Sequence, residues 1–372
     1  MDTYRPAVGT PIEDLDTPCL LVDLDALEHN QSVIADTYRD TVCKMAPHVK
    51  NTKCPIIIHM QFRAGGTAES VCSAKVSEAE VMVGSGIRNI LIANQVAAKG
   101  KIERLCSLAK RATMRVTIDN PRNVRALSEA ATRHGVTIGV VIEVSVRESG
   151  GRGGVRRMAP GGLEQGVELA KLAESLPGIA FKGVMSHQSL PGKPDRETRF
   201  LDGPPLIQRC LDMKDAIEAA GIPVEVVSSG ETFSYDIAPT MPGVTEVEGG
   251  TYMLMSHPFD YMTEFDIAGK VLGTVISTPR PGVAIGDVGS RGLVSMGALP
   301  QVDGMPGITV KELHEEHIIL DMEAPARLEV GDQFLLTSGQ QDFMTDRWDQ
   351  HIAVRNGVVE AVWPILARGC YH

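Results

Sequence analysis

Lys44-Met45-Ala46-Pro47-His48-Val49-Lys50-Asn51-Thr52-Lys53 is the stretch that decides how this chain of 372 residues is interpreted. The run at 41–43 predicts a short strand before it, and residues 54–58 predict the start of a helix after it. A lysine at the end of a strand is well placed for chemistry, because strand carboxyl ends form the active face of an α/β barrel. The neighbouring cations His48 and Lys53 favour a lowered pKa for Lys50, which a Schiff-base lysine requires. Taken alone, however, the stretch suits a solvated basic turn better.

The composition is that of a soluble globular protein, with 43% hydrophobic and 22% charged residues. A net charge of -11 argues against nucleic acid as the main partner, although it leaves room for a small anionic ligand. No run approaches the roughly 20 apolar residues of a membrane span, and residues 1–5 contain no apolar signal core. The seven scattered cysteines lack metal-type spacing and predict reduced thiols in a cytoplasmic protein.

Strand and helix signals alternate through the first two thirds of the chain. The predicted strands lie at 17–22, 41–43, 70–73, 90–93, 114–118, 136–146, 179–186, 224–229 and 244–248. The predicted helices include 24–38 after an Asp23 cap, 77–83, 96–111, one opened by Asn120 or Asp119 with Pro121, 162–176 and 205–220. About eight strands between 43 and 248 predict a closed (β/α)8 TIM-type barrel. The alternative is a doubly wound open sheet, but no Gly-x-Gly-x-x-Gly follows a first strand.

The pattern changes after about residue 261 to short alternating segments, at 273–277, 317–320, 333–336 and 351–354. The turn Arg355-Asn356-Gly357-Val358 predicts a hairpin. We therefore predict a C-terminal antiparallel β domain. The expected division is a barrel at 23–260 and a β domain formed by 1–22 and 261–372.

These features together resemble a family of known enzymes. The order of Asp16-Thr17-Pro18-Cys19-Leu20, Pro47-His48-Val49-Lys50, Ser228-Ser229-Gly230, Gly250-Thr251-Tyr252 and Val362-Trp363-Pro364 is similar to that of alanine-racemase-fold (fold type III) pyridoxal-phosphate enzymes. Within that fold, the chain most resembles the D-threonine aldolase and D-serine dehydratase group. The resemblance runs through nearly the whole chain.

The resemblance implies that Lys50, which follows His48 and Val49, binds pyridoxal 5'-phosphate covalently and that His48 also belongs to the cofactor-binding residues. Loops with backbone donors suit the cofactor's phosphate, which gives one predicted cradle at Ser229, Gly230 and Thr232 and a second at Gly250, Thr251 and Tyr252. Ordinary strand-to-helix turns are the competing interpretation of both loops.

Two further residues take roles from the resemblance. Arg152 matches an arginine that would contact the cofactor or the substrate carboxylate, and an exposed loop arginine is an equal alternative. His187 matches a ring-bearing position lining the cofactor, where a buried structural histidine is the alternative. His317, in an acidic segment, could assist proton transfer or belong to an exposed charged turn.

The predicted metal site departs from the family's pattern. Relatives carry a His-x-Cys or His-x-Asp pair at the positions of Gln340 and Asp342, and they usually carry histidine at the position of Thr52. An amide and a carboxylate form an all-oxygen pair that would favour Mg²⁺, Mn²⁺ or Ca²⁺ over zinc and would bind the ion more weakly, with Mg²⁺ or Mn²⁺ the predicted ion. In the competing interpretation the loop has lost its metal and Asp342 acts as a hydrogen-bonding partner or base.

The predicted activity is retro-aldol cleavage of a D-β-hydroxy amino acid to glycine and an aldehyde or oxo-acid. The alternatives are a D-serine or 3-hydroxyaspartate-type dehydratase and a metal-free amino-acid racemase of the same fold. A barrel that only binds the cofactor is a non-enzymatic possibility, but the β domain argues for an enzyme. In the family this domain completes the active site across a dimer, so a homodimer with shared active sites is expected.

Overall fold

The computed structural model describes residues 4–145, 162–187 and 195–372, and these form two compact units. The barrel unit comprises Ile34–Lys50, Ile57–Gly250 and Cys370–His372. The β unit comprises Met1–Val33, Asn51–Ile56 and Thr251–Gly369.

The barrel unit contains an eight-stranded parallel sheet in its described part, in the order β2-β9-β8-β7-β6-β5-β4-β3. Its strands are β2 (Lys44–Met45), β3 (Ser70–Ser73), β4 (Asn89–Gln95), β5 (Thr113–Ile118), β6 (Ile138–Glu143), β7 (Ile179–Ser186), β8 (Val226–Ser229) and β9 (Glu246–Val247). Parallel bridges from Met45 to Thr67 and from His48 to Cys72 join the two ends of the sheet. The sheet therefore closes, as the barrel prediction requires.

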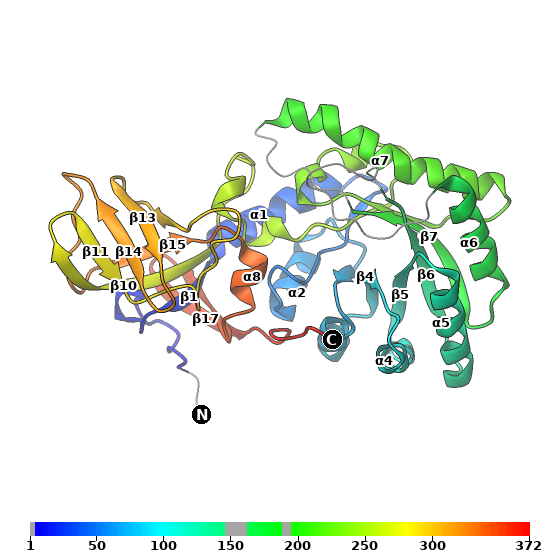
Figure 1. Ribbon diagram of the computed structural model, residues 1–372, viewed down its shortest axis with the longest axis horizontal. Helices are drawn as coiled ribbons and strands as arrows, with labels where there is room; N and C mark the ends of the chain where they lie inside the picture. Colours follow the sequence, from blue (N-terminus) through cyan, green and yellow to red (C-terminus); the bar gives the residue numbers. More distant parts are fainter. Residues whose placement is uncertain (1–3, 146–161, 188–194) are drawn as a thin grey trace. The chain divides into compact units, whose positions relative to one another are not determined.

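Helices cover the outside of this sheet (Figure 1). They are α2 (Pro55–Ala64), α3 (Val76–Gly84), α4 (Lys99–Ala109), α5 (Pro121–His134), α6 (Leu163–Ser175) and α7 (Arg196–Ala219). The first two residues of α2 and the first part of α1 (Leu24–Tyr38) belong to the β unit. Two predicted helix starts are confirmed. Asp23 accepts hydrogen bonds from the backbone of Asp25 and Ala26 at 3.1 and 3.2 Å, and Asn120 accepts one from Arg122 at 2.8 Å.

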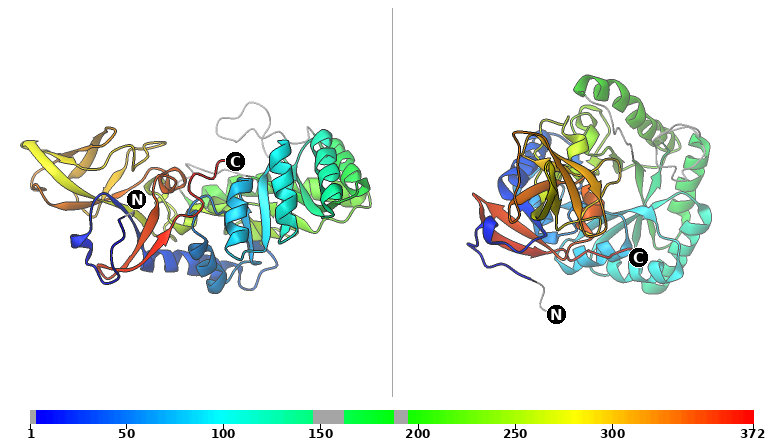
Figure 2. Two further views of the ribbon diagram at one scale, coloured as in Figure 1. Left: turned by 90° about the horizontal axis from the view of Figure 1, so that it is seen from below. Right: turned by 60° about the vertical axis from the view of Figure 1, so that its left-hand side comes forward.

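The β unit is built around a mostly antiparallel sheet, whose strands are labelled in Figure 1 and drawn again in Figure 2. Its strands follow the order β13-β14-β11-β10-β1-β16-β17, and β15 pairs with both β10 and β12. They are β1 (Cys19–Asp23), β10 (Gly269–Arg280), β11 (Val283–Gly286), β12 (Gln301–Asp303), β13 (Ile308–Leu313), β14 (Ile318–Met322), β15 (Gln333–Thr337), β16 (Gln350–Arg355) and β17 (Val358–Pro364). A short helix, α8 (Gln341–Thr345), lies between β15 and β16.

The predicted closing hairpin is confirmed. β16 and β17 pair antiparallel, with Arg355 opposite Val358. The two turn residues, Asn356 and Gly357, have φ of 50° and 77°. Positive φ at both central positions is what a tight hairpin requires, and asparagine and glycine adopt it most readily.

Two predicted elements differ from the structure. The strand expected at 41–43 lies instead at Lys44–Met45, because Val42 is 86% exposed and Thr41 bonds locally to the Cys43 carbonyl oxygen at 2.7 Å. The helix expected to start at 205 starts at Arg196 and continues through Pro204 and Pro205. A proline pair is a strong start signal, so the first part of α7 was missed.

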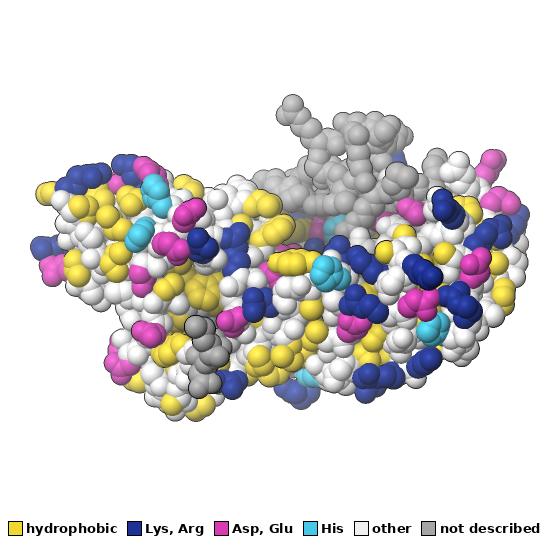
Figure 3. Space-filling view, turned by 60° about the horizontal axis from the view of Figure 1, so that its bottom comes forward, with side chains coloured by type: hydrophobic (Ala, Val, Ile, Leu, Met, Phe, Trp, Pro, Cys, Tyr) yellow, Lys and Arg dark blue, Asp and Glu magenta, His cyan; other side chains and the backbone are white. Residues whose placement is uncertain are grey.

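The charge of the surface and the polarity of the helices indicate which kinds of partner the protein suits. On the face drawn in Figure 3, Lys and Arg side chains are interspersed with Asp and Glu side chains over the described residues. Ion pairs among the described residues include those of Arg104 with Glu80 and of Arg133 with Glu103, each at 2.5 Å. Among the described helices, none is both long enough and apolar enough to cross a membrane.

Candidate active site

Lys50 lies in a turn that the barrel holds from both sides. The backbone N–H of His48 donates to the Gly249 carbonyl oxygen at 2.8 Å, and that of Val49 donates to the Cys72 carbonyl oxygen at 2.9 Å. The N–H of Lys50 donates to Nδ1 of His48 at 3.3 Å. Because β3 and the segment after β9 both bond to this turn, the backbone of the lysine is fixed at the carboxyl ends of the strands, half-buried.

A buried carboxyl group lies in the same part of the barrel. Glu248 accepts hydrogen bonds from Ser228 Oγ at 2.7 Å and from Cys72 Sγ at 3.2 Å. Burial raises the pKa of Glu248 to about 7, against the effect of the Ser228 bond. Burial also raises the pKa of the Cys72 thiol, with Glu248 adding to the effect and the positive charge of Lys50 opposing it. The barrel thus contains a carboxyl group that titrates near neutrality, hydrogen-bonded to a thiol that responds to the charge of Lys50.

A second polar layer lies two residues earlier along the chain, at Glu246 and Ser70. Arg115 on β5 donates to Glu246 on β9 at 2.9 Å, and Ser70 on β3 donates to the same oxygen at 3.2 Å. Since β5 and β9 are not neighbours in the sheet, the Arg115 bond crosses the barrel interior. Barrel interiors are usually filled by branched apolar side chains, so this one is unusually polar.

Two loops after neighbouring strands suit a phosphate group. Gly230 and Thr232 follow β8, Gly249 and Gly250 follow β9, and Glu248 N donates to Gly230 O at 3.3 Å, which joins the loops. A Cβ on Gly249 would lie 3.0 Å from Met45 and 3.4 Å from the Thr232 nitrogen. Gly230 has a φ of 128°, which favours glycine. Close, side-chain-free backbone of this kind fits the donor set that a phosphate needs.

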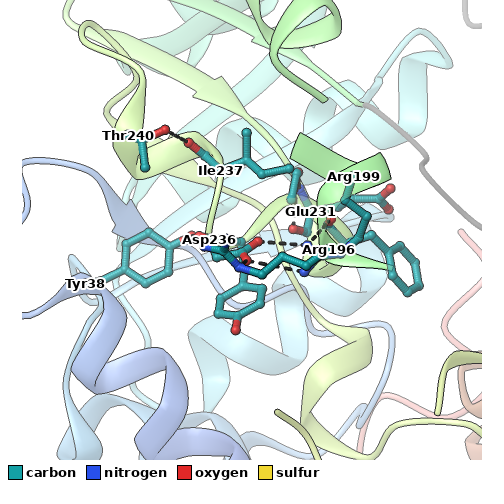
Figure 4. A network of polar contacts seen from close by, with 10 residues as sticks. Tyr38, Arg196, Arg199, Glu231, Asp236, Ile237 and Thr240 are labelled. Atoms are coloured by element: carbon teal, nitrogen blue, oxygen red, sulfur yellow. Dashed lines mark hydrogen bonds and ion pairs between the residues drawn. The ribbon is translucent and has the colours of Figure 1, made fainter. Parts of the chain in front are cut away.

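A buried ion pair contacts the loop after β8 (Figure 4). Arg199 of α7, 1% exposed, donates to Asp236 at 2.8 and 3.3 Å and to the Phe233 carbonyl oxygen at 2.9 Å. Arg196 also pairs with Asp236, at 3.3 Å. On the other side, the Tyr38 hydroxyl donates to the carbonyl oxygen of Tyr235 at 2.7 Å. These contacts anchor the loop carrying Thr232 to α7 on one side and to α1 on the other.

The other predicted residues of the barrel unit are partly placed. His187 directly follows β7, half-buried at the carboxyl end of the strand. The neighbouring Ser186 hydroxyl lies 2.8 Å from that of Ser229, which joins the ends of β7 and β8. Arg152 falls outside the described residues. The roles of His187 and Arg152 stay predictions.

Thr251 and Tyr252 follow Gly250 in the chain but belong to the β unit. They open a 3-10 helix in which Met255 N donates to the Thr251 carbonyl oxygen at 2.9 Å. Tyr252 is fully buried, and burial raises its pKa well above the ordinary value. A phenol in this state stays neutral, so it would act as a hydrogen-bond donor.

The predicted metal pair does not gain a third ligand. Among the described residues, no group of three or more His, Cys, Asp and Glu side chains could hold an ion. Gln340 is the N-cap residue of α8, without a side-chain capping bond, and Asp342 Oδ1 accepts a hydrogen bond from Asn51 Nδ2 at 2.8 Å. His317 lies exposed between β13 and β14. These donors do not fit Mg²⁺ or Mn²⁺ well, because such ions need about six oxygen ligands.

Several residues of these clusters were missed from the sequence, namely Cys72, Glu248, Arg199, Asp236 and Asn51. Glu248 could have been noticed, since a charged residue directly after a barrel strand lies at the active face. The others gave no local signal, because their partners are remote in the sequence.

Comparisons with known proteins agree with this geometry. Residues 22–258 match the family described as alanine racemase, N-terminal domain, and residues 268–354 match a putative serine dehydratase domain. The chain is 33% identical over 375 residues to a 3-hydroxy-D-aspartate aldolase of Paracoccus denitrificans (strain Pd 1222), covering 97% of this chain and 94% of that protein. It is 32% identical to a D-threonine aldolase of Arthrobacter sp, covering 97% and 95%. The crystal structure of D-threonine aldolase from Filomicrobium marinum superposes with a TM-score of 0.92 at 31% identity, covering 99% of this chain and 100% of that one.

Proposed function

Because the chain belongs to the alanine racemase N-terminal domain family, we propose that it is a pyridoxal-phosphate-dependent lyase. It cleaves a D-β-hydroxy amino acid between Cα and Cβ, releasing glycine and an aldehyde or oxo-acid. The two aldolases that align over nearly its whole length support this reaction. The observation that carries the proposal is the fixed turn of Lys50, bonded on one side to Cys72 and on the other to Gly249.

The residues of the barrel unit would hold the cofactor by one covalent bond and by hydrogen bonds to its phosphate. Lys50 would bind it covalently through its amine, and backbone donors near Ser229, Gly230, Thr232 and Gly250 would bind its phosphate. Once bound, pyridoxal phosphate supplies the electron sink for a bond broken at Cα.

His48 accepts a hydrogen bond from the backbone N–H of Lys50 through its ring Nδ1 and so helps to fix the backbone of this turn. His187, at the end of β7, would line the same end of the barrel. Thr251 and Tyr252 would add hydroxyl donors, and Arg152 would contact the cofactor or the substrate carboxylate.

Three finer features remain proposals. We expect a homodimer with shared active sites, in which an exposed residue such as His317 could assist proton transfer. We also expect a cytoplasmic location, with which the seven cysteines agree because none of them forms a disulfide. A divalent ion at Gln340 and Asp342 stays a prediction that the donor set there does not favour.

A dehydratase is the second candidate, because residues 268–354 match a putative serine dehydratase domain. In that reaction Cα–H breaks, hydroxide leaves Cβ, and the product is an oxo-acid with ammonia. Product analysis separates the two reactions, since only the aldolase releases glycine. A racemase would release neither glycine nor ammonia.

Lys50→Ala tests the cofactor assignment. Wild-type protein treated with pyridoxal phosphate and borohydride should yield a modified peptide containing Lys50, whereas Lys50→Ala should yield none and release no glycine. Lys53→Gln is the matched control, because Lys53 instead pairs with Asp346 at 3.6 Å. A modified Lys53 in the Lys50→Ala protein would transfer the role to that residue.

A further inference from the structure

Asn51 and Asp342 meet in one hydrogen bond within the β unit, although they lie far apart in the sequence. Nδ2 of Asn51 donates to Oδ1 of Asp342 at 2.8 Å. Asn51 is fully buried, and Asp342 is half-buried. An ionised carboxylate only accepts hydrogen bonds, so the amide must present its NH₂ group to Asp342. The bond therefore fixes which way the amide of Asn51 faces.

The remaining atom of that amide is an open acceptor. Oδ1 of Asn51 is buried and has no hydrogen-bond partner among the described residues. Buried polar atoms are nearly always paired, because an unpaired one loses its hydration without compensation. Asn51 also follows Lys50 directly in the chain. An unpaired buried acceptor in the residue that follows the proposed cofactor lysine is suited to a hydrogen-bond donor from a ligand.

The chemistry of the pair favours a hydrogen-bond donor over a metal ion. A hard divalent ion needs several oxygen ligands, whereas the nearest carboxylate, Asp342, already has one oxygen bonded to an amide N–H. The hydrogen atoms of that neutral amide carry partial positive charge, which would repel a cation at this position. A hydroxyl group needs only one acceptor, which Oδ1 of Asn51 supplies.

We propose that Asn51 accepts a hydrogen bond directly from the substrate's β-hydroxyl group, that Asp342 orients the amide for this contact, and that the site works without a divalent ion. This inference rests on the proposed lyase function. Asn51 is a substrate-binding residue in this account, and Asp342 is a positioning residue.

Metal binding provides a test that does not depend on activity. Mn²⁺ should leave the thermal unfolding midpoint of the wild type unchanged. Asn51→Asp replaces the NH₂ group by a second carboxylate facing Asp342, so Mn²⁺ should raise the midpoint of that variant by on the order of 5 °C. Asn356→Asp, the same substitution in the exposed hairpin turn, is the control and should not respond. A wild type stabilised as strongly as Asn51→Asp would overturn the proposal.

Activity provides the second test. Wild type dialysed exhaustively against EDTA, and free of metal by elemental analysis, should retain full retro-aldol activity. Asn51→Ala should lower kcat/KM for β-hydroxy amino acids by about 10- to 100-fold, the usual effect of one hydrogen bond to a polar group in a buried site. Its affinity for D-alanine, which lacks the hydroxyl group, should not change when followed by cofactor absorbance.

The outcomes distinguish a failure of the metal-free site from a failure of the lyase function. Loss of activity on chelation with recovery on adding Mn²⁺ would refute the metal-free site, and so would an equal loss of affinity for D-alanine in Asn51→Ala. If the wild type cleaved no β-hydroxy amino acid at all, the lyase function would be wrong. The thermal comparison would still decide whether residues 51 and 342 bind an ion.

Discussion

Replacing Glu248 by glutamine should remove most of the pH dependence of the barrel unit's stability in mildly acidic solution. Glu248 is 4% exposed, and its two oxygens accept bonds from Ser228 and Cys72. Burial raises its pKa from 4.5 to about 7. Because the folded-state pKa is the higher one, folding favours the protonated carboxyl group. This contribution to stability is fully present below pH 4.5 and is lost as pH rises through 7.

The size of the effect follows from the same values. At about 1.4 kcal/mol per pKa unit, the difference between 4.5 and about 7 corresponds to on the order of 3 kcal/mol in the free energy of unfolding. Glutamine has nearly the same shape but no titrating proton, so the variant should be the more stable protein above pH 7 and should lose this advantage near pH 4.5.

Two spectroscopic probes report on the unfolding of different units in one urea titration. Both tryptophans, Trp348 and Trp363, belong to the β unit, whereas α3 to α7 belong to the barrel unit. Far-UV circular dichroism therefore reports mainly the barrel, and tryptophan fluorescence reports the β unit. Glu225→Gln, at an exposed glutamate, is the control. If the barrel transition of Glu248→Gln depended on pH as steeply as that of the wild type, the assignment of this titration to Glu248 would be refuted.

Two other predictions concern buried polar groups, namely His351 in the β unit and the pair of Arg199 and Asp236 in the barrel unit. Burial lowers the pKa of His351 from 6.5 to about 4, so its contribution to β-unit stability is present above pH 6.5 and is lost as pH falls toward 4. The wild-type fluorescence transition should lose on the order of 3 kcal/mol over that range, and His351→Gln should not. In the barrel, Asp236→Ala leaves the guanidinium of Arg199 buried without its carboxylate and should cost about 3–5 kcal/mol. Arg199→Met should cost less, because Asp236 still pairs with Arg196. Both variants should bind pyridoxal phosphate more weakly in a fluorescence titration, and unchanged affinity in both would show that the ion pair does not support the loop.

The fold was predictable because its signals are local and repeat along the chain. Asp23 and Asn120 cap helices as their positions indicate, and Asn356-Gly357 forms the predicted turn. The errors occurred where tertiary contacts override a local signal. β2 is only two residues long and is defined by pairing with β9, so the β-prone residues just before it gave a misleading boundary.

The candidate site was predictable only where a motif carried it. Lys50 and the two glycine-containing loops occur in short runs whose order matches a family. Arg199 was missed because Pro204 and Pro205 suggested a later helix start, which left the residue outside any element. Glu248 and Cys72 interact across 176 residues of sequence, and nothing near either residue indicates the contact.

The metal prediction shows why a family resemblance predicts a fold better than it predicts a set of metal ligands. Considered separately, the amide at 340 and the carboxylate at 342 are a weakened ligand pair that a hard ion could still use. In the structure, Asp342 faces Asn51, which is 291 residues away in the sequence and brings an N–H group to the carboxylate. Because Oδ1 of Asp342 already accepts a hydrogen bond from Asn51, it is less able to bind an ion than a carboxylate oxygen that faces water. Residues 51 and 342 therefore act as one polar pair, and substituting either of them changes what the other can bind.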